Sequence, residues 1–142
     1  SWAGSPACTD IEISDVSING VRLGRGIAIV GGQDITVVRA HVADIDQAGL
    51  YAASGAGYLD GANITFDQCS VTNVGRNVIP SGVGMGAYFA QVAGGDISRT
   101  TITGCQTSGI WIESSCSGIT VAAHGANTIT NSGGQAVVNH SV

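Results

Sequence analysis

The sequence has few charged residues and no lysine. Charged residues make up 11% of the chain, against about 25% in an average globular protein. The five basic residues are all arginine, and the formal net charge is −5. Proteins that bind nucleic acid depend on many lysine and arginine contacts to phosphates, so this composition argues against a nucleic-acid partner. An uncharged or weakly charged ligand fits better.

Long apolar runs and metal-binding spacings are also missing. No apolar run approaches the ~20 residues that a membrane-spanning helix needs, so we expect no membrane span. The four cysteines show neither a CxxC pair nor a Cys/His spacing typical of metal sites. We expect no metal and no other cofactor. The cysteines are interpreted as small buried side chains, with a disulfide such as Cys105–Cys116 as the alternative.

Glycine, by contrast, is abundant, and it accompanies an internal repeat. There are 22 glycines in 142 residues, about twice the ~7% average. Five segments open with a similar phrase around an isoleucine, at positions 11, 35, 64, 97 and 119, which lie 24, 29, 33 and 22 residues apart. Such spacings suit one coil of a solenoid each. The Asp or Asn that opens four units is interpreted as turn chemistry rather than as a calcium ladder, at Asp10, Asp34, Asn63 and Asp96.

Two further phrases recur in each unit. The first is an apolar residue, then any residue, then Gly, Asp or Asn, then usually a small apolar residue. The third position holds only residue types that tolerate a left-handed backbone, which predicts a sharp bend at Gly20, Asp44, Asn73, Gly104 and Asn131. The second is a glycine followed by alternating apolar residues, which is typical of a half-buried strand. Each unit therefore reads strand, bend, strand, turn, strand. We predict an all-β fold, a right-handed single-stranded parallel β-helix of about five coils, forming a single domain over residues 1–142.

Two insertions interrupt the repeat, and both ends look uncapped. The insertions cover residues 54–61 and 76–85. Extra residues in a solenoid form loops on one side, often the binding side. Because neither end shows an obvious cap for its exposed backbone groups, we expect a segment of a longer protein or ends closed by self-association.

The phrases Asn63-Ile64-Thr65 and Gly109-Ile110-Trp111-Ile112 resemble the parallel β-helix repeats of the pectate-lyase-like superfamily. The resemblance covers nearly the whole chain from Asp10, and its members are mostly polysaccharide lyases, glycoside hydrolases and phage tailspikes. It implies a polysaccharide partner, a location outside the cell or on a virion surface, and a homotrimer as in tailspikes. The catalytic motifs of polygalacturonases and alginate epimerases are absent, so the resemblance assigns no enzyme family.

Stacked coils would place three aromatic residues on one outward face. The predicted row is Ala28, Tyr51, Tyr88, Trp111 and Val137, and its aromatic members are candidates for binding sugar rings. The alternative is that these aromatics fill ordinary strand positions under the insertion loops. A second outward row is predicted two residues further on, at Val30, Ala53, Ala90, Glu113 and Asn139.

Glu113 is the only acid in the second row, so it is the candidate general acid for glycoside hydrolysis. Its partner carboxylate would be Asp60, or less favourably Asp46 or Asp67. The alternative is a solvated surface glutamate.

For a lyase, Arg76 is the preferred residue to neutralise the uronate, with a plain surface arginine as the alternative. The other polar candidates for lyase chemistry are Arg99, His41, His124, Tyr51, Tyr58 and Tyr88. The sequence thus leaves three functions open: an enzyme acting on polysaccharides, a non-catalytic glycan-binding or receptor-binding solenoid, and a structural spacer.

Overall fold

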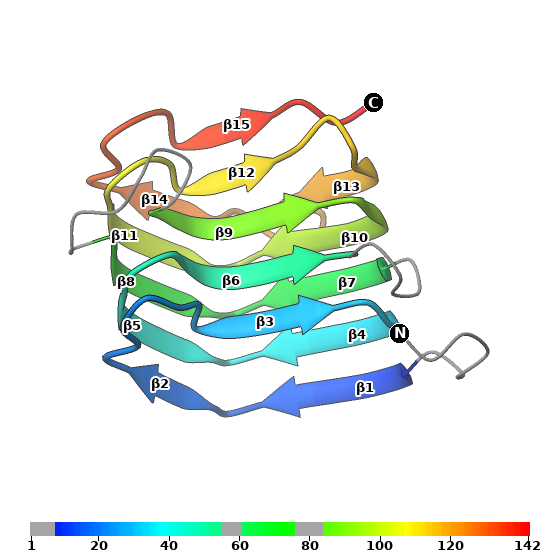
Figure 1. Ribbon diagram of the computed structural model, residues 1–142. Helices are drawn as coiled ribbons and strands as arrows, with labels where there is room; N and C mark the ends of the chain where they lie inside the picture. Colours follow the sequence, from blue (N-terminus) through cyan, green and yellow to red (C-terminus); the bar gives the residue numbers. More distant parts are fainter. Residues whose placement is uncertain (1–7, 55–60, 76–83) are drawn as a thin grey trace.

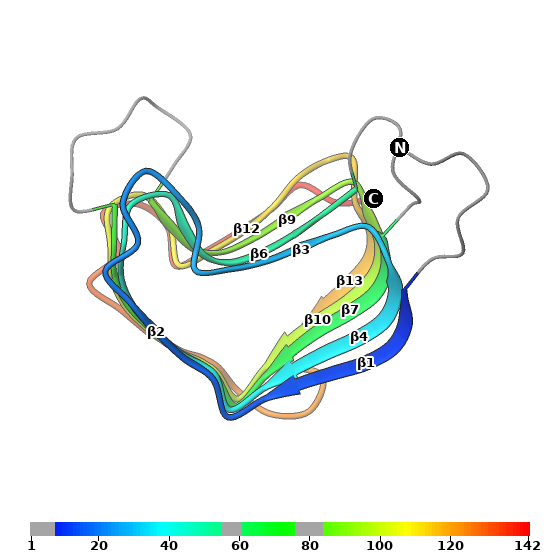
Figure 2. The ribbon, with the colours of Figure 1, turned by 60° about the horizontal axis from the view of Figure 1, so that its bottom comes forward.

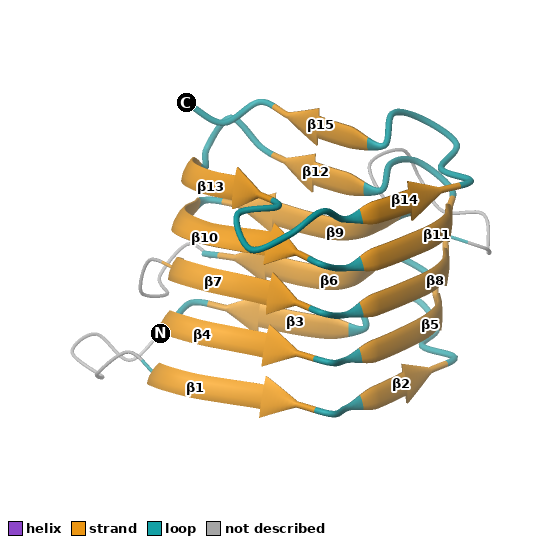
Figure 3. Ribbon diagram, turned by 180° about the vertical axis from the view of Figure 1, so that it is seen from behind, coloured by secondary structure: helices purple, strands orange, loops and turns teal. Residues whose placement is uncertain are grey.

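The computed structural model describes residues 8–54, 61–75 and 84–142, and every element in these ranges is a β-strand (Figures 1 and 3). The strands form three five-stranded sheets, in which all neighbours are parallel. Sheet A contains β1 (Thr9–Ser14), β4 (Gln33–Val38), β7 (Gly61–Asp67), β10 (Val92–Ser98) and β13 (Ser117–Val121). Sheet B contains β2 (Ser17–Asn19), β5 (His41–Ile45), β8 (Ser70–Val74), β11 (Thr101–Cys105) and β14 (Thr128–Thr130). Sheet C contains β3 (Ile27–Val30), β6 (Ala48–Ala53), β9 (Met85–Ala90), β12 (Ile110–Ile112) and β15 (Val137–Asn139).

The chain passes through the three sheets in turn, so each coil adds one strand to each sheet. This confirms the predicted all-β solenoid and its right-handed parallel β-helix class. The three sheets form three sides around a common interior (Figure 2). Within the described ranges no helix is present that could cross a membrane.

Stacked apolar side chains fill the interior. Equivalent positions of successive coils lie in register, for example Val42, Val71 and Ile102 in sheet B, and all three are buried. Phe66 of sheet A meets Phe89 of sheet C edge to face, with ring centroids 5.5 Å apart. Burying each such side chain stabilises the fold by ~1.5–3 kcal/mol. The inward positions are therefore fixed, and so is the outward direction of the residues between them.

The predicted bends are present in all five coils. The backbone angle φ is positive at each position: 77° at Gly20, 55° at Asp44, 56° at Asn73, 71° at Gly104 and 54° at Asn131. Asp and Asn tolerate this left-handed conformation better than other non-glycine residues. The Asn73 side chain also donates to the Asp44 carboxylate one coil away, at 3.3 Å.

The predicted alignment of the fourth coil is wrong by two residues. Gly95, not Ile97, pairs with Ile64 and Ile119, whereas Ile97 pairs with Phe66. Ile97 still points inward, because side chains alternate with a period of two and a two-residue shift preserves the face. A Cβ atom at Gly95 would overlap the backbone of Ile64, so a glycine is needed there.

Asp96 is consequently no counterpart of the Asp and Asn residues that open the other units. It is buried, and its carboxylate accepts hydrogen bonds from the hydroxyls of Ser98 and Thr120, the latter at 2.7 Å. Asp10, Asp34 and Asn63 all have positive φ, and the Asn63 amide donates to the Asp34 carboxylate at 3.0 Å. Hydrogen bonds from these side chains to backbone N–H groups stay a prediction.

The predicted alignment of the fifth coil is wrong by one residue. Trp111 pairs with Val138 rather than Val137, and Asn139 pairs with Ile112. In the first four coils a glycine lies just before the sheet C strand or at its second residue, because a Cβ atom there would press on the next coil: at Gly49 it would lie 2.8 Å from the Gly86 carbonyl oxygen. The fifth coil has Ala136 instead, so the sequence signal that marks the strand start is lost.

Three of the four cysteines are buried as predicted. Cys69, Cys105 and Cys116 are free thiols in the interior, and Cys8 is a free exposed thiol. The alternative of a Cys105–Cys116 disulfide is therefore wrong. Burial raises the pKa of the Cys105 thiol to about 12, and it raises the pKa values of Cys69 and Cys116 as well. These thiols act as small apolar side chains.

Candidate functional site

The predicted outward row of sheet C is confirmed in its first four positions. Ala28, Tyr51, Tyr88 and Trp111 lie side by side on consecutive strands. The three aromatic side chains are half-buried, while their neighbours along each strand point into the core. We call Tyr51, Tyr88 and Trp111 the aromatic row. The strands that carry it are rigid, because each is paired on both sides.

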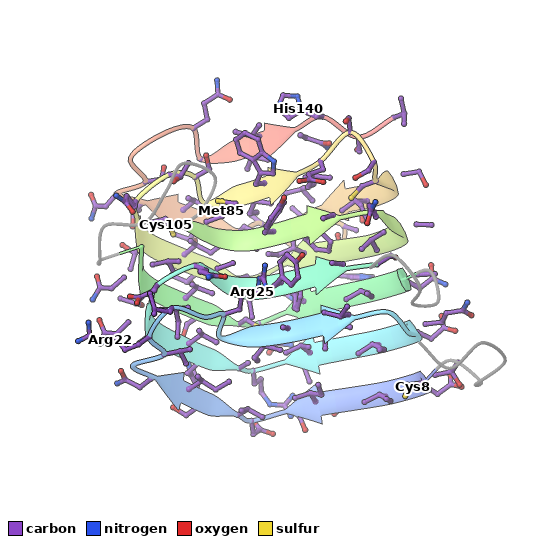
Figure 4. All side chains as sticks on the ribbon, in the orientation of Figure 1. Cys8, Arg22, Arg25, Met85, Cys105 and His140 are labelled. Carbon is purple, nitrogen blue, oxygen red and sulfur yellow. The ribbon has the colours of Figure 1, made fainter. Side chains whose placement is uncertain are left out.

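Arg25 covers one end of the aromatic row. Its guanidinium lies 3.9 Å from the centre of the Tyr51 ring, a cation–π contact, and it comes from the turn before β3 (Figure 4). The Tyr51 ring also meets Tyr88 at an angle of 60°, with centroids 5.4 Å apart. A ligand that binds at Tyr51 would therefore contact the Arg25 guanidinium as well as the tyrosine ring. Sequence reasoning missed Arg25, because a single arginine before a strand carries no motif.

Tyr88 and Glu113 form a hydrogen-bonded pair. The Tyr88 hydroxyl donates to Glu113 Oε1, and the Ser115 hydroxyl donates to Oε2 at 3.2 Å. Burial, and next the neighbouring Glu113 carboxylate, raise the pKa of Tyr88 well above its usual value. The Tyr88 hydroxyl thus stays protonated at neutral pH and is a poor general base. Glu113 is not the isolated solvated residue of the alternative interpretation.

A pocket opens beside this pair. Its volume is about 240 Å³, and it is lined by Met85, Tyr88, Thr107, Trp111 and Glu113. Met85 lies at the start of β9, on the same side of the molecule as the aromatic row (Figure 4). Among these lining residues Glu113 is the only acid, and the rest of the wall is mainly apolar. The pocket can hold one ring-sized group with a polar edge toward Glu113.

His140 extends the row into the fifth coil. Its ring lies 5.5 Å from the Trp111 ring, centroid to centroid, and its backbone N–H donates to the Ile112 carbonyl at 3.0 Å (Figure 4). Sequence reasoning assigned no role on this face to His140, because the one-residue error in the fifth coil aligned Asn139 with Glu113. With the correct register, its position next to Trp111 and Glu113 follows directly.

The other predicted catalytic residues fall into two groups, those outside the described residues and those that the structure places away from the pocket lining. Asp60 and Arg76 lie outside the described residues, as does Tyr58. Asp46 is buried and accepts a 2.8 Å hydrogen bond from the backbone N–H of Leu23. It does not line the pocket.

Asp67 and Arg99 are paired with each other. The Arg99 guanidinium donates to both carboxylate oxygens of Asp67, from Nε at 2.9 Å, and it holds the pKa of that carboxyl below its usual value. Asp67 ends β7, and Arg99 directly follows β10. Neither is among the residues that line the pocket at Glu113.

The two remaining histidines lie on other sides of the solenoid. His41 begins β5 of sheet B, where its Nδ1 lies 2.7 Å from the Ser70 hydroxyl oxygen. His124 lies in the turn between β13 and β14. Within the ranges that the structure describes, no three His, Cys, Asp or Glu side chains gather as a metal site would require.

Comparison with known proteins gives one match. A family model described as the right handed beta helix region matches residues 4–141. No curated protein and no solved structure gives a significant match. The match concerns the fold of almost the whole chain.

Proposed function

The chain belongs to the right-handed β-helix family, and we propose that sheet C binds an extended polysaccharide along the aromatic row. The observation that carries this proposal is the pocket between Tyr88, Trp111 and Glu113, in line with the rest of the row. We place this activity outside the cell or on a virion surface. The homotrimer implied by the resemblance stays a prediction, which a mass measurement by light scattering tests.

The outward side chains of sheet C have the chemistry needed to bind a sugar chain. Aromatic rings cover the apolar faces of sugar rings while leaving the hydroxyl groups of the sugar free to bind polar partners. Arg25, Glu113 and Ser115 supply donors and acceptors beside the row. Because successive coils are ~4.8 Å apart, equivalent side chains repeat along the solenoid axis, which favours a ligand that is itself extended.

We propose binding without cleavage. Glycoside hydrolysis uses two carboxyl groups about 5–9.5 Å apart, and Glu113 is the only acid among the described residues that line the pocket. A lyase needs a base, and the protonated Tyr88 hydroxyl is unsuited to that role. The pair of Glu113 and Asp60 stays a prediction, as does the role of Arg76.

A glycan array tests the proposal. The purified protein should bind one or more extended polysaccharides, and Trp111→Ala should weaken binding about tenfold because an aromatic contact is lost. Leu23→Ala is the matched control, since Leu23 is 79% exposed and is not among the residues that line the pocket. Unchanged binding in the Trp111 variant would place the ligand elsewhere. Shortened products in the incubated ligand would show that the protein cleaves it.

A further inference from the structure

The described residues that line the pocket at Glu113 include one charged residue. They are Met85, Tyr88, Thr107, Trp111 and Glu113, and the charged group is the Glu113 carboxylate. No arginine or histidine is among these lining residues. The chain as a whole carries a net charge of −5. The local and the overall field therefore both favour a cation over an anion.

The Glu113 carboxylate is oriented by two hydrogen bonds and can still accept others. Tyr88 donates to one carboxylate oxygen and Ser115 to the other. A carboxylate has about four lone-pair sites, so acceptor capacity remains for a ligand. The two hydroxyls fix the orientation of the half-buried carboxylate, which lowers the entropy cost of binding a donor there.

The aromatic wall adds a second attraction for positive charge. An ammonium group over the face of a tryptophan is attracted to the ring, and this contact is stronger when the ammonium group is partly desolvated. Trp111 and Glu113 line the same pocket. An ammonium group placed between them would donate to the carboxylate and contact the indole face together.

We propose that this pocket selects a sugar unit that carries a protonated amine, so that the ligand of sheet C is an amino-sugar polymer with free amines. This inference rests on the proposed function. A uronic acid unit should bind poorly in this pocket, because its carboxylate would be repelled by the negative charge of Glu113. Arg25 and His140 lie beside the row but are not among the described residues that line the pocket: Arg25 lies on Tyr51, and His140 packs on Trp111 from the fifth coil.

Three hexasaccharides test the selection. Cellohexaose, its fully N-acetylated amino analogue and the corresponding free-amine glucosamine hexamer share one β-1,4-linked backbone and differ only at C2. Calorimetry at about pH 5.5, where the glucosamine amine is protonated, should show the free-amine hexamer binding about tenfold more tightly than either neutral hexamer. The preference should shrink as salt is added, because salt screens a partly exposed ion pair.

Two variants that each remove one negative charge test whether the preference for the amine arises at Glu113. Glu113→Gln keeps an acceptor for Tyr88 but removes the charge, so the preference for the amine should fall to within about twofold. Glu12→Gln removes the same charge from an exposed position on β1 of sheet A and should leave the preference intact. Circular dichroism melting of both variants checks that each is folded.

The outcomes separate the two proposals. Equal affinity for the three hexamers, tighter binding of an oligogalacturonate, or an unchanged preference in Glu113→Gln would overturn the amine selection while leaving glycan binding in place. Failure of all the hexamers and of every array glycan to bind would overturn the proposed function itself. An amine preference that disappears only in Glu113→Gln supports both.

Discussion

At the scale of single residues, the pair of Tyr88 and Glu113 has a measurable consequence for the titration of the protein. Burial, followed by the neighbouring carboxylate, raises the pKa of Tyr88. An unperturbed tyrosine ionises near pH ~10. The folded protein therefore holds the Tyr88 proton more tightly than the unfolded chain does.

Stability should consequently fall in alkali. The contribution of Tyr88 is fully present below the ordinary tyrosine pKa of about 10 and is lost as the pH rises above it toward the raised folded value. Tyr88→Phe cannot ionise, so its urea midpoint should fall less steeply over this range than that of the wild type. Equal slopes for the two proteins would mean that Tyr88 is not perturbed.

Asn73 shows how a single residue fixes a bend. Its φ of 56° is costly for most residues, and its side chain bonds Asp44. Asn73→Ala should lower the free energy of unfolding by about 1–2 kcal/mol, because alanine tolerates this backbone poorly. Asn73→Gly should cost less, since glycine adopts it freely. Urea denaturation of both variants measures the difference, and an alanine variant as stable as the glycine variant would contradict the role of the bend.

At the scale of strands, the close stacking in sheet C depends on a row of glycines. A Cβ atom at Gly49 would press on Val71 and on the Gly86 carbonyl, which would push β6 and β9 apart. Gly49→Ala should therefore destabilise the protein by about 1–3 kcal/mol. Gly24→Ala is the control, since Gly24 is not in the left-handed region and the added Cβ would meet only the Val21 side chain, at 3.0 Å, and the Arg22 carbonyl oxygen, at 3.7 Å. Thermal melting of the two variants should rank Gly49→Ala as the less stable.

The strands also show how far the sequence could predict the fold. The repeated bends and the alternation fixed which residues point inward, so the solenoid and the row from Ala28 to Trp111 were predictable. The register between neighbouring strands was less predictable, because a shift of two residues leaves the same side chains pointing inward. Ile97 was therefore aligned with Ile64, whereas it pairs with Phe66. In the fifth coil the glycine marker is replaced by Ala136, and the error there hid His140.

The site was only partly predictable for a related reason. Outward positions follow from alternation, which brought Tyr88, Trp111 and Glu113 to one face. Contacts between side chains depend on rotamers and on the conformation of turns, and neither leaves a periodic pattern in the sequence. The stacking of Arg25 on Tyr51 and the pairing of Tyr88 with Glu113 are contacts of that kind.

At the scale of the whole molecule, stability comes from stacked apolar columns and backbone pairing rather than from charge. Residue pairs far apart in sequence make most of the contacts, as expected when each coil packs only on its neighbours. In two ion pairs of the described chain, Asp15–Arg39 and Asp67–Arg99, the arginine side chain is 48% exposed, and pairs open to solvent in this way contribute little.

The unfolding midpoint should therefore change little with salt. Urea denaturation at low and at high sodium chloride should give nearly the same midpoint, because few surface charges are available to be screened. Binding of the free-amine hexamer should weaken under the same change. A midpoint that shifts as strongly as the affinity would show that charge also holds the fold together.

The most direct test of ligand binding on sheet C is to map the bound ligand by nuclear magnetic resonance. An array-selected oligosaccharide is titrated into isotope-labelled protein, and amide shifts are assigned to the three sheets. We expect shifts concentrated on β6, β9 and β12, strongest around Tyr88, Trp111 and Glu113. Shifts confined to sheets A and B would contradict ligand binding on sheet C.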